Sequence, residues 1–290
     1  PLEQGLVAYY PFNSNAKDES GNGNDGEVKG PVSAEDRFGL QSSSYEFSRV
    51  TDVIDIPNIP SNTLTVSLWY KYNGFQKKHH TLLCHDEIPN GIHHLIVDEY
   101  NKNIGCYNSK FIGSGYKFTA GQTYFIVLMK DVKNCTIFIN GLPVSSHGDC
   151  FENKAWPLSW IGNCGTQGGQ GALGIIDDVR IYNRALSEAE VAALYELEKP
   201  EARPGGSVSV LNVPVDYATI QAAIDAAKNH DTVLVAPGIY REHLRLQGKQ
   251  ITLASRFLIS RDEKDVRRST TWTGDVADSR NTVTRFKNVI

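Results

Sequence analysis

The chain has 290 residues, with 29 lysines and arginines against 33 aspartates and glutamates and a net charge of −4. This length allows one large β domain or two domains, and the charge balance excludes an electrostatic case for binding nucleic acid or an anionic membrane. No apolar run approaches the ~18 residues of a membrane helix, so we expect no membrane insertion. Pro1 is not a natural start, which indicates a mature form or a cut chain.

The first predicted element is a strand within residues 1–12, where apolar side chains alternate along the chain. A loop rich in asparagine, glycine and aspartate follows at Asn13–Gly30. Such a loop turns repeatedly and exposes many carbonyl oxygens. Hard oxygen donors of this kind are the ligands that calcium prefers. The alternative interpretation is a network of Asx-turns without a metal.

Short strands separated by turn signals are predicted from Tyr45 to Tyr72. Trp69 lies in the middle of one of them, and we expect it to fill the core rather than to stack on a sugar, because large aromatic side chains in strands usually do so. Tyr70 and Tyr72 share the face opposite to Trp69. From this face, either tyrosine can reach a ligand.

The segment His79–Tyr107 is unusually rich in histidine, and it predicts a hairpin in which Thr81–His85 pairs with Ile92–Val97. That pairing brings Cys84 or His85 near His93 or His94, which allows a transition-metal site. The favoured interpretation is a solvated hairpin face, because no third ligand has a recognisable spacing.

Five cysteines lie in the first two thirds of the chain and show no C-x-x-C spacing, which argues against a zinc knuckle or a redox motif; they are Cys84, Cys106, Cys135, Cys150 and Cys164. Cys135 and Cys150 flank a predicted hairpin, so one bridge between them is possible. The alternative is that the cysteines are small buried hydrophobic residues. Cysteine usage therefore leaves the compartment open.

A second hairpin region is predicted from Tyr124–Met129 and Cys135–Val144, and Asn140-Gly141 is the strongest turn signal in the chain. The loops that follow, Ser145–Pro157 with Trp156 and the glycine-rich Gly165–Gly174, lie at one edge of the expected β fold. Ligands usually bind at loops in this position.

The stretch Gly174–Tyr195 combines a strand, a turn and a helix. Asp177 and Asp178 lie inside the strand, where acids are rare unless they have a partner. Because side chains alternate along a strand, we expect Asp177 near the core and Asp178 on the opposite face. Ser187 and Glu190 have the spacing of a helix capping box, and Leu186 with Val191 that of a hydrophobic staple.

These segments together resemble the laminin G-like, concanavalin A-like lectin/glucanase jelly rolls. Leu6–Gly26 resembles the family's first strand and its Asp/Asn/Gly-rich loop, and Gly174–Tyr195 resembles its last strand and closing helix. Between these ends, three internal strands agree with the family's order: Leu64–Tyr72, Cys135–Val144 and Ser159–Asn163. The resemblance implies an antiparallel jelly-roll β-sandwich over residues 1–199.

In jelly rolls of this type, such a loop and an acid of the last strand commonly enclose a structural calcium ion. The resemblance therefore implies calcium as a cofactor, with Asp18 and Asp177 as its main ligands. Asn13, Asn22 and Asn24 are weaker candidates. A divalent cation would also explain Asp177, because a carboxylate beside the core is unfavourable alone.

Residues 200–207 read as a linker, and a second domain is expected over 208–290. An amphipathic helix is predicted at Thr219–Ala227, with a buried strand at Thr232–Ala236. The stretch Tyr217–Leu246 resembles the capped start of a pectin lyase-like right-handed parallel β-helix. The 83 residues after Ser207 suffice for two or three coils, so we expect the natural protein to continue beyond Ile290. The chain as a whole is predicted to be mainly β.

No catalytic group is predicted. Paired carboxylates at the spacing used by glucanases are absent from the sequence, and the catalytic coils of pectin lyase-like proteins would lie downstream. We expect a non-catalytic, calcium-stabilised module, secreted or at the cell surface, that binds a polysaccharide or other glycan. The candidate sugar-binding aromatic residues are Tyr70, Tyr72, Tyr107 and Trp156, with Tyr100 and Tyr116 as further members. The alternatives are the targeting end of a polysaccharide lyase, hydrolase or esterase, and an adhesive or structural surface protein.

Overall fold

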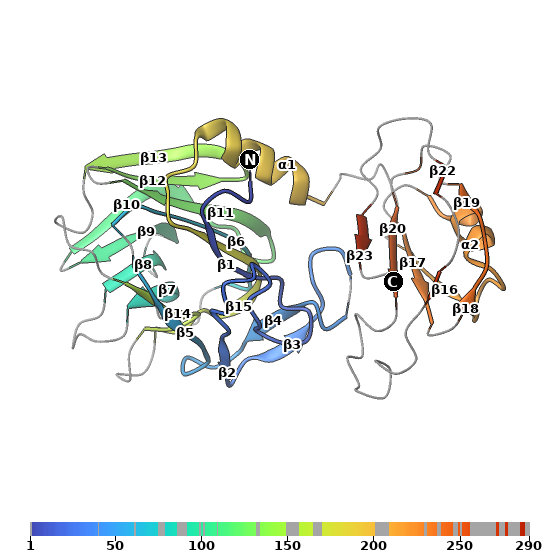
Figure 1. Ribbon diagram of the computed structural model, residues 1–290. Coiled ribbons are helices and arrows are strands. Elements are labelled where there is room, and N and C mark those ends of the chain that lie inside the picture. The colour runs from blue at the N-terminus through green and yellow to red at the C-terminus, as the bar shows by residue number, and fades with distance from the viewer. Residues whose placement is uncertain are drawn as a thin grey trace. The chain divides into compact units, whose positions relative to one another are not determined.

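A computed structural model describes most of the chain (Figure 1). The described residues are 2–39, 41–60, 62–74, 79–85, 92–98, 100, 102–108, 110–131, 134–148, 157–164, 170–200, 209–228, 231–236, 239–245, 249, 251–255, 271–272, 276–277 and 285–287. The chain divides into two compact units, the first with residues 1–37 and 41–199 and the second with residues 38–40 and 200–290. Each unit is described by itself.

The first unit contains an eight-stranded antiparallel sheet with the spatial order β13-β12-β11-β6-β15-β4-β3, in which β1 also pairs with β15. Its strands are β1 (Leu6–Tyr10), β3 (Val32–Ala34), β4 (Ser44–Phe47), β6 (Leu64–Tyr72), β11 (Thr123–Lys130), β12 (Asn134–Ile139), β13 (Leu142–Gly148) and β15 (Gly174–Tyr182). The predicted turn at Asn140-Gly141 joins β12 to β13, and both residues have positive φ angles of 51° and 81°. Such angles are what a two-residue hairpin turn requires.

A seven-stranded antiparallel sheet forms the second layer of this unit, with the order β10-β9-β8-β7-β14-β5-β2. Its strands are β2 (Glu27–Lys29), β5 (Val53–Ile59), β7 (His80–His85), β8 (Ile92–Val97), β9 (Asn103–Asn108), β10 (Lys110–Lys117) and β14 (Leu158–Ile161). The predicted pairing of β7 with β8 is confirmed, and its turn lies outside the described residues.

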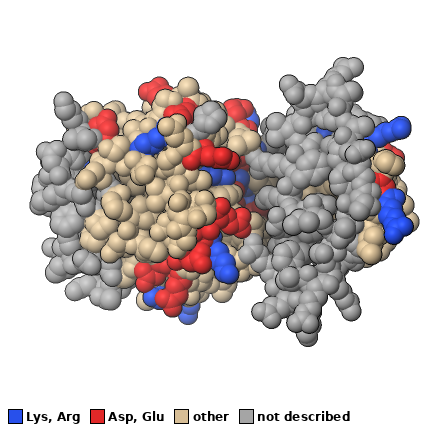
Figure 2. All heavy atoms as spheres, in the orientation of Figure 1, with Lys and Arg blue, Asp and Glu red and all other residues tan. Residues whose placement is uncertain are grey.

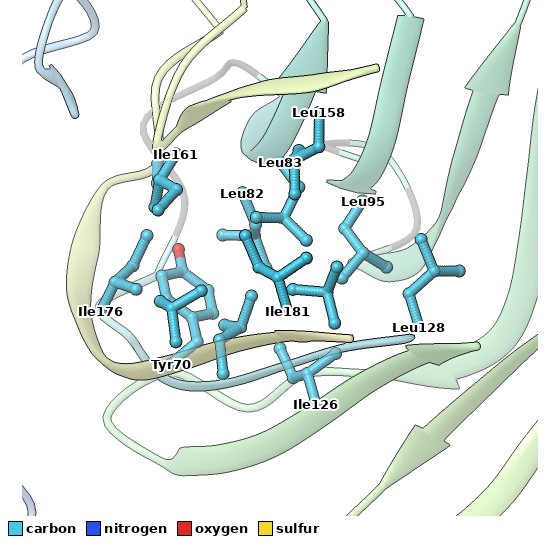
Figure 3. Close-up of a cluster of buried hydrophobic side chains, with 14 of the residues drawn as sticks. Tyr70, Leu82, Leu83, Leu95, Ile126, Leu128, Leu158, Ile161, Ile176 and Ile181 are labelled. Carbon is cyan, nitrogen blue, oxygen red and sulfur yellow. The ribbon is translucent and has the colours of Figure 1, made fainter. Parts of the chain in front are cut away.

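One apolar core fills the space between the two sheets, and it includes Leu82, Leu95 and Leu158 from the seven-stranded sheet and Ile126 and Ile181 from the eight-stranded sheet (Figure 3). A second cluster covers the other face of the eight-stranded sheet, where helix α1 (Glu188–Glu198) packs Val191 and Leu194 against Trp69, Phe125 and Phe138. Strand β6 is therefore buried on both faces. The predicted antiparallel β-sandwich is confirmed for this unit.

Helix α1 begins where the sequence predicts. Ser187 accepts a hydrogen bond from the Glu190 backbone N–H, and the Glu190 side chain accepts one from the Ser187 backbone N–H at 2.8 Å. Leu186 and Val191 are both buried in the cluster with Trp69. The predicted capping box is confirmed, and the helix is thereby fixed at the residue that follows the last strand and its turn.

The second unit is built from short parallel strands around an apolar cluster that includes Val213, Ile224 and Val233. Its sheets have the orders β16-β17-β20-β23, β18-β21 and β19-β22, all with parallel pairing. The elements are β16 (Val210–Val213), α2 (Ile220–Ala226), β17 (Thr232–Val235), β18 (Ile239–Tyr240), β19 (Leu244–Arg245), β20 (Thr252–Ser255), β21 (Thr271–Trp272), β22 (Val276–Ala277) and β23 (Arg285–Lys287). In the described part of the chain, neither helix is long and apolar enough to cross a bilayer.

Candidate functional site

A row of side chains crosses the seven-stranded sheet on the face that points away from the core. Strand pairing places Asp55 opposite Trp160, Trp160 opposite Cys84, Cys84 opposite His93, and His93 opposite Tyr107. Residues directly opposite one another in neighbouring strands project to the same side of a sheet. We call these five residues the outer row.

The orientation of the outer row follows from its neighbours. The adjacent row contains Ile54, Ile161, Leu83 and Leu95 in register, and all four side chains belong to the core between the sheets; the last three are visible in Figure 3. Side chains alternate along a strand, although pairing shifts interrupt the alternation at several points of this sheet. None of the five outer-row residues belongs to the core, so the outer row faces away from it.

Aromatic rings flank the central pair of this row, Cys84 and His93, on both sides. Trp160 and Tyr107 are half-buried, and Phe111 on β10, which pairs with Tyr107, is half-buried as well. The His93 ring lies edge-on to Tyr107, with 5.6 Å between the ring centroids. Rings that are partly exposed and held by their neighbours can stack on a flat apolar surface at a low entropic cost.

A disulfide lies in the middle of the row and joins Cys84 to Cys164 with a Cα–Cα distance of 5.3 Å. The segment after β14 follows β7, because the Gly162 N–H donates to the Leu82 carbonyl at 2.9 Å and the Thr81 N–H donates to the Gln170 carbonyl at 2.7 Å. Of the possible Cys135–Cys150 bridge, Cys150 lies outside the described residues. Cys106 and Cys135 are buried, as the alternative interpretation of the cysteines requires.

The histidines of the β7–β8 hairpin are buried, so the expectation of a solvated hairpin face is wrong for four of the five. His80, His85, His93 and His94 are each at most 4% exposed. Both faces of these strands are covered, which alternation alone could not predict. Burial disfavours the charged imidazolium and lowers the pKa of His80 to about 4 and that of His94 to about 3. His79 is the exception: it is half-buried and lies 3.4 Å from the Asp98 carboxylate.

Asp177 and Asp178 are both bound by one buried arginine. Arg37 donates from its two terminal nitrogens to Asp177 Oδ2 at 2.5 Å and to Asp178 Oδ2 at 2.8 Å. The expectation that Asp178 faces away from Asp177 is therefore wrong. Asp178 has a positive φ of 47° at an irregularity in the pairing of β15 with β6. A bulge of this kind interrupts the alternation of side chains.

The same charge cluster extends to the end of helix α1. Arg37 Nε donates to the Glu198 carbonyl at 3.0 Å, Trp69 Nε1 donates to the Glu198 carboxylate at 2.8 Å, and Arg180 forms an ion pair with that carboxylate. Burial opposes the charge on Arg37, but Asp178 and Asp177 outweigh it and raise its pKa. The cluster ties β15 and β6 to α1, so we assign it a structural role.

The loop Asn13–Gly30 is organised around Asp18. Its carboxylate accepts backbone N–H groups from Tyr9 at 2.9 Å, Ser20 at 2.8 Å and Asn24 at 2.9 Å. Burial alone would raise the pKa of Asp18, but hydrogen bonds from Ser20 and from these backbone groups lower it. The side-chain amides of Asn22 and Asn24 donate to the Val7 carbonyl at 3.1 and 2.9 Å. This arrangement matches the Asx-turn network.

The predicted calcium ligands are thus engaged in two different sets of contacts. Asp18 accepts hydrogen bonds within the loop, and Asn13, which is buried, accepts a hydrogen bond at its carbonyl from the Asn15 amide at 3.1 Å. Asp177 is neutralised by Arg37. The geometry therefore fits the loop network better than a calcium site that includes Asp177, and calcium binding itself stays a prediction.

The predicted sugar-binding aromatic residues separate into three groups. Tyr70 and Tyr72 are 0% and 1% exposed, and the Tyr70 hydroxyl donates to the Leu173 carbonyl at 3.1 Å. The expectation that they reach a ligand is wrong, because their shared face of β6 is the face that packs between the sheets. Trp69 is buried, as predicted. Tyr107 lies in the outer row, and Trp156 lies outside the described residues.

Trp160 and Phe111 were not expected at the site. No local sequence pattern marks either residue as part of the site, because strand register alone brings each of them beside the outer row. The described part of the face shown in Figure 2 is largely uncharged, with acidic side chains in small groups and few basic ones.

Fold and site together define a lectin-like jelly roll with an aromatic outer sheet face. Residues 48–192 match the Laminin_G_3 family model, described as the concanavalin A-like lectin/glucanases superfamily. The chain belongs to this superfamily. No functionally curated protein matches the chain in sequence.

Solved structures show the same fold at low sequence identity. Domain 4 of AbnA, an extracellular GH43 arabinanase from Geobacillus stearothermophilus in complex with arabinotriose, is 23% identical with a TM-score of 0.55, covering 66% of this chain and 98% of that domain. Trypanosoma rangeli sialidase in complex with sialic acid is 17% identical with a TM-score of 0.54, covering 66% of this chain and 32% of the sialidase. The receptor binding domain of botulinum neurotoxin D is 17% identical with a TM-score of 0.51, covering 68% and 54%.

Proposed function

We propose that the first unit is a non-catalytic carbohydrate-binding module that acts outside the cell. The observation that carries this proposal is the outer row, in which Trp160 and Tyr107 lie in register on the side of the sheet that faces away from the core, with Phe111 beside them. All three rings are half-buried. The partly apolar faces of sugar rings stack on such side chains. Arabinotriose in the complex of the arabinanase domain supports a glycan as the ligand class.

The spacing of the row favours an extended ligand. Trp160 and Tyr107 are three strands apart, which corresponds to roughly 14 Å at about 4.8 Å for each inter-strand step. Phe111 lies one strand further on. A ligand that contacts all three rings must contain several sugar residues, so we propose a polysaccharide chain rather than a single terminal sugar.

Binding can be tested by affinity electrophoresis of the full chain in gels that contain individual neutral and acidic polysaccharides. At least one polysaccharide is expected to retard the wild-type protein, and Trp160→Ala and Tyr107→Ala are each expected to weaken binding by about tenfold, the equivalent of ~1.4 kcal/mol. Leu142→Ala is the control, because Leu142 is 69% exposed and lies on β13 of the other sheet. Equal retardation of wild type and both row variants, with native circular dichroism, would exclude this face.

Calcium remains a separate prediction for the module. An ion that binds only the folded state adds about 2.7 kcal/mol at 100 times its dissociation constant. Thermal unfolding in calcium and then in chelator tests this: a rise of several degrees with calcium supports a metal in the loop Asn13–Gly30. An unchanged midpoint, together with elemental analysis that finds no calcium, would leave the hydrogen bonds of Asp18 as what holds the loop.

We further propose that the second unit is the start of a right-handed parallel β-helix, and that the module delivers this β-helix to a polysaccharide. The parallel stacks of β16, β17 and β20 and the apolar cluster beneath α2 support this. A disulfide trap tests the stacking: Asn212→Cys with Leu234→Cys, which are paired, should cross-link on oxidation. Asn212→Cys with Thr232→Cys, which are out of register, should not. The reverse result would contradict the parallel stack.

A further inference from the structure

Cys84, Cys164 and His93 form a compact group. Cys84 and His93 lie between the aromatic rings of the outer row, but the glycan-binding proposal assigns no chemistry to the thiols or the imidazole. One ligand atom from each residue, the two sulfurs and an imidazole nitrogen, lies within 4.8 Å of the others. Among the described residues, this is the one group of three or more histidine, cysteine or carboxylate side chains that converges so closely. All three side chains are at most 9% exposed.

We propose that, once the disulfide is reduced, Cys84, Cys164 and His93 bind a thiophilic divalent cation such as zinc. Two thiolates and one imidazole are a ligand set that zinc uses in proteins, and three protein ligands leave a fourth position for a small ligand. The strand register brings Cys84 and His93 together on β7 and β8, and the segment after β14 supplies Cys164.

The surroundings of the group suit a metal site. The Thr81 hydroxyl lies 2.7 Å from His93 Nδ1 and fixes the orientation of the ring, as hydrogen-bonding partners of ligating histidines commonly do. The His85 carbonyl oxygen lies 3.2 Å from Cys84 Sγ and 3.9 Å from Cys164 Sγ, where it can accept a hydrogen bond from either thiol in the metal-free reduced form.

The two sulfur atoms need only a small displacement to change from the disulfide to a pair of thiolates bound to a metal ion. A disulfide holds its sulfurs about 2.05 Å apart, whereas two sulfurs on a tetrahedral zinc ion with bonds of about 2.3 Å are separated by roughly 3.8 Å. Side-chain rotation at Cys84 and Cys164 can supply this change. The site is therefore compatible with the sheet as it stands.

The chemistry of the switch is thiol–disulfide exchange. A dithiol reductant transfers two electrons and two protons, so the Cys84–Cys164 bond breaks, two thiols form, and the reductant becomes a disulfide. Binding of the divalent cation then displaces the two thiol protons, and His93 ligates as the neutral imidazole. Oxidation by a disulfide of the glutathione class reverses the process: the two protein thiolates form their bond again, the oxidant gains two electrons and takes up two protons from solvent to become two thiols, and the cation is released.

Cobalt(II) is the probe for this site, because its thiolate complexes absorb visible and near-ultraviolet light. The full chain is reduced with dithiothreitol, desalted without oxygen and titrated with Co²⁺. We expect one ion per chain, a sulfur-to-cobalt charge-transfer band, the visible bands of a tetrahedral ion, and displacement by Zn²⁺. The oxidised chain is expected to show none of these signals.

Variants separate this site from adventitious binding. His93→Gln is expected to weaken Co²⁺ binding by at least ~tenfold, and Cys84→Ser to abolish the charge-transfer band. His243→Gln in the second unit is the control, since His243 is exposed, and it should bind as wild type does. If Cys84→Ser does not fold, His93→Gln and the oxidised wild type carry the test.

Three results would overturn the proposal. The first is a reduced chain with native circular dichroism and no charge-transfer band. The second is His93→Gln with wild-type affinity, and the third is a reduced chain that loses its sheet structure even with Co²⁺ present. Loss of metal binding with retained polysaccharide binding, or the reverse, would distinguish this proposal from the glycan-binding one.

Discussion

A single buried carboxylate, Asp177, shows how the charge cluster stabilises the first unit. Asp177→Ala leaves the Arg37 guanidinium, 3% exposed, with one carboxylate partner fewer. Breaking a buried pair typically costs about 3–5 kcal/mol, so we expect a loss of about 3 kcal/mol in the free energy of unfolding, measured with urea in the presence of chelator. Glu196→Ala, which removes an exposed ion pair with Lys199, is the control, and its effect should stay below about 1 kcal/mol. A loss seen only in calcium buffer would instead place Asp177 at a calcium site.

His80 gives the stability of the fold a defined pH dependence. Its pKa is lowered to about 4 by burial and by the charge of His79, against about 6.5 in an unfolded chain. Between these values the unfolded chain binds a proton that the folded chain does not, so stability is full above about pH 6.5 and falls as the pH drops toward 4. One such group contributes about 1.36 kcal/mol per pH unit.

Urea unfolding at pH 7 and pH 5 measures this slope. His80→Gln is expected to reduce the change in the free energy of unfolding between pH 7 and pH 5 by the contribution of His80. The variant also loses the contact with the Tyr70 hydroxyl at 3.0 Å, which will lower stability at both pH values. Stability that does not vary between pH 7 and pH 5 would show that His80 is solvated.

Residue-scale predictions from the sequence succeed where the partner is local. The pair Ser187 and Glu190 is recognisable because three residues separate its members. The partner of Asp177 is Arg37, 140 positions away, and no local pattern identifies it. The family resemblance predicts a calcium ion beside this carboxylate, and that stays a prediction; the fold places the Arg37 guanidinium there.

At the scale of the element, helix α1 depends on its first turn. Ser187→Ala removes the side chain that accepts the Glu190 N–H, and we expect it to lower the free energy of unfolding by about 1 kcal/mol. Glu188→Gln, in the same turn but outside the capping box, should change it by less than about 0.5 kcal/mol. Chemical denaturation of both variants measures the difference. Equal effects would mean that first-turn charge, rather than the cap, sets the start of the helix.

The sequence predicts which segments form strands, but it does not predict the register in which the strands pair or the positions of the bulges. The sequence indicates β6, β11 and β12 through runs of apolar residues, and the alternation on β6 correctly separates Trp69 from Tyr70. The alternation does not show which face of β6 meets the second sheet. The sequence therefore predicts Tyr70 as a ligand-binding residue, whereas Tyr70 packs in the core. The outer row likewise arises from the register of five strands, in which β14 (Leu158–Ile161) inserts between β5 and β7 although it comes much later in the sequence.

At the scale of the whole molecule, the first unit contains its own complete cores. Every residue of the core between the sheets and of the cluster under α1 lies within residues 1–199. We therefore expect residues 1–199 to fold alone, with the far-ultraviolet circular dichroism of a β protein and a cooperative thermal transition. Residues 1–186, which lack α1 and Glu198, expose Trp69 and should unfold or aggregate. Cooperative unfolding of the shorter fragment would show that the helix is dispensable.

The Cys84–Cys164 disulfide closes a covalent ring with a sequence separation of 80, and this ring encloses the connections between β7 and β14. A protease that cuts once inside the ring leaves two polypeptides still joined by sulfur. Such a clipped molecule migrates as one band on a gel without reductant and as two bands with it. Proteolytic resistance judged only under non-reducing conditions would therefore overestimate how intact this module is, and paired gels reveal the nicked form directly.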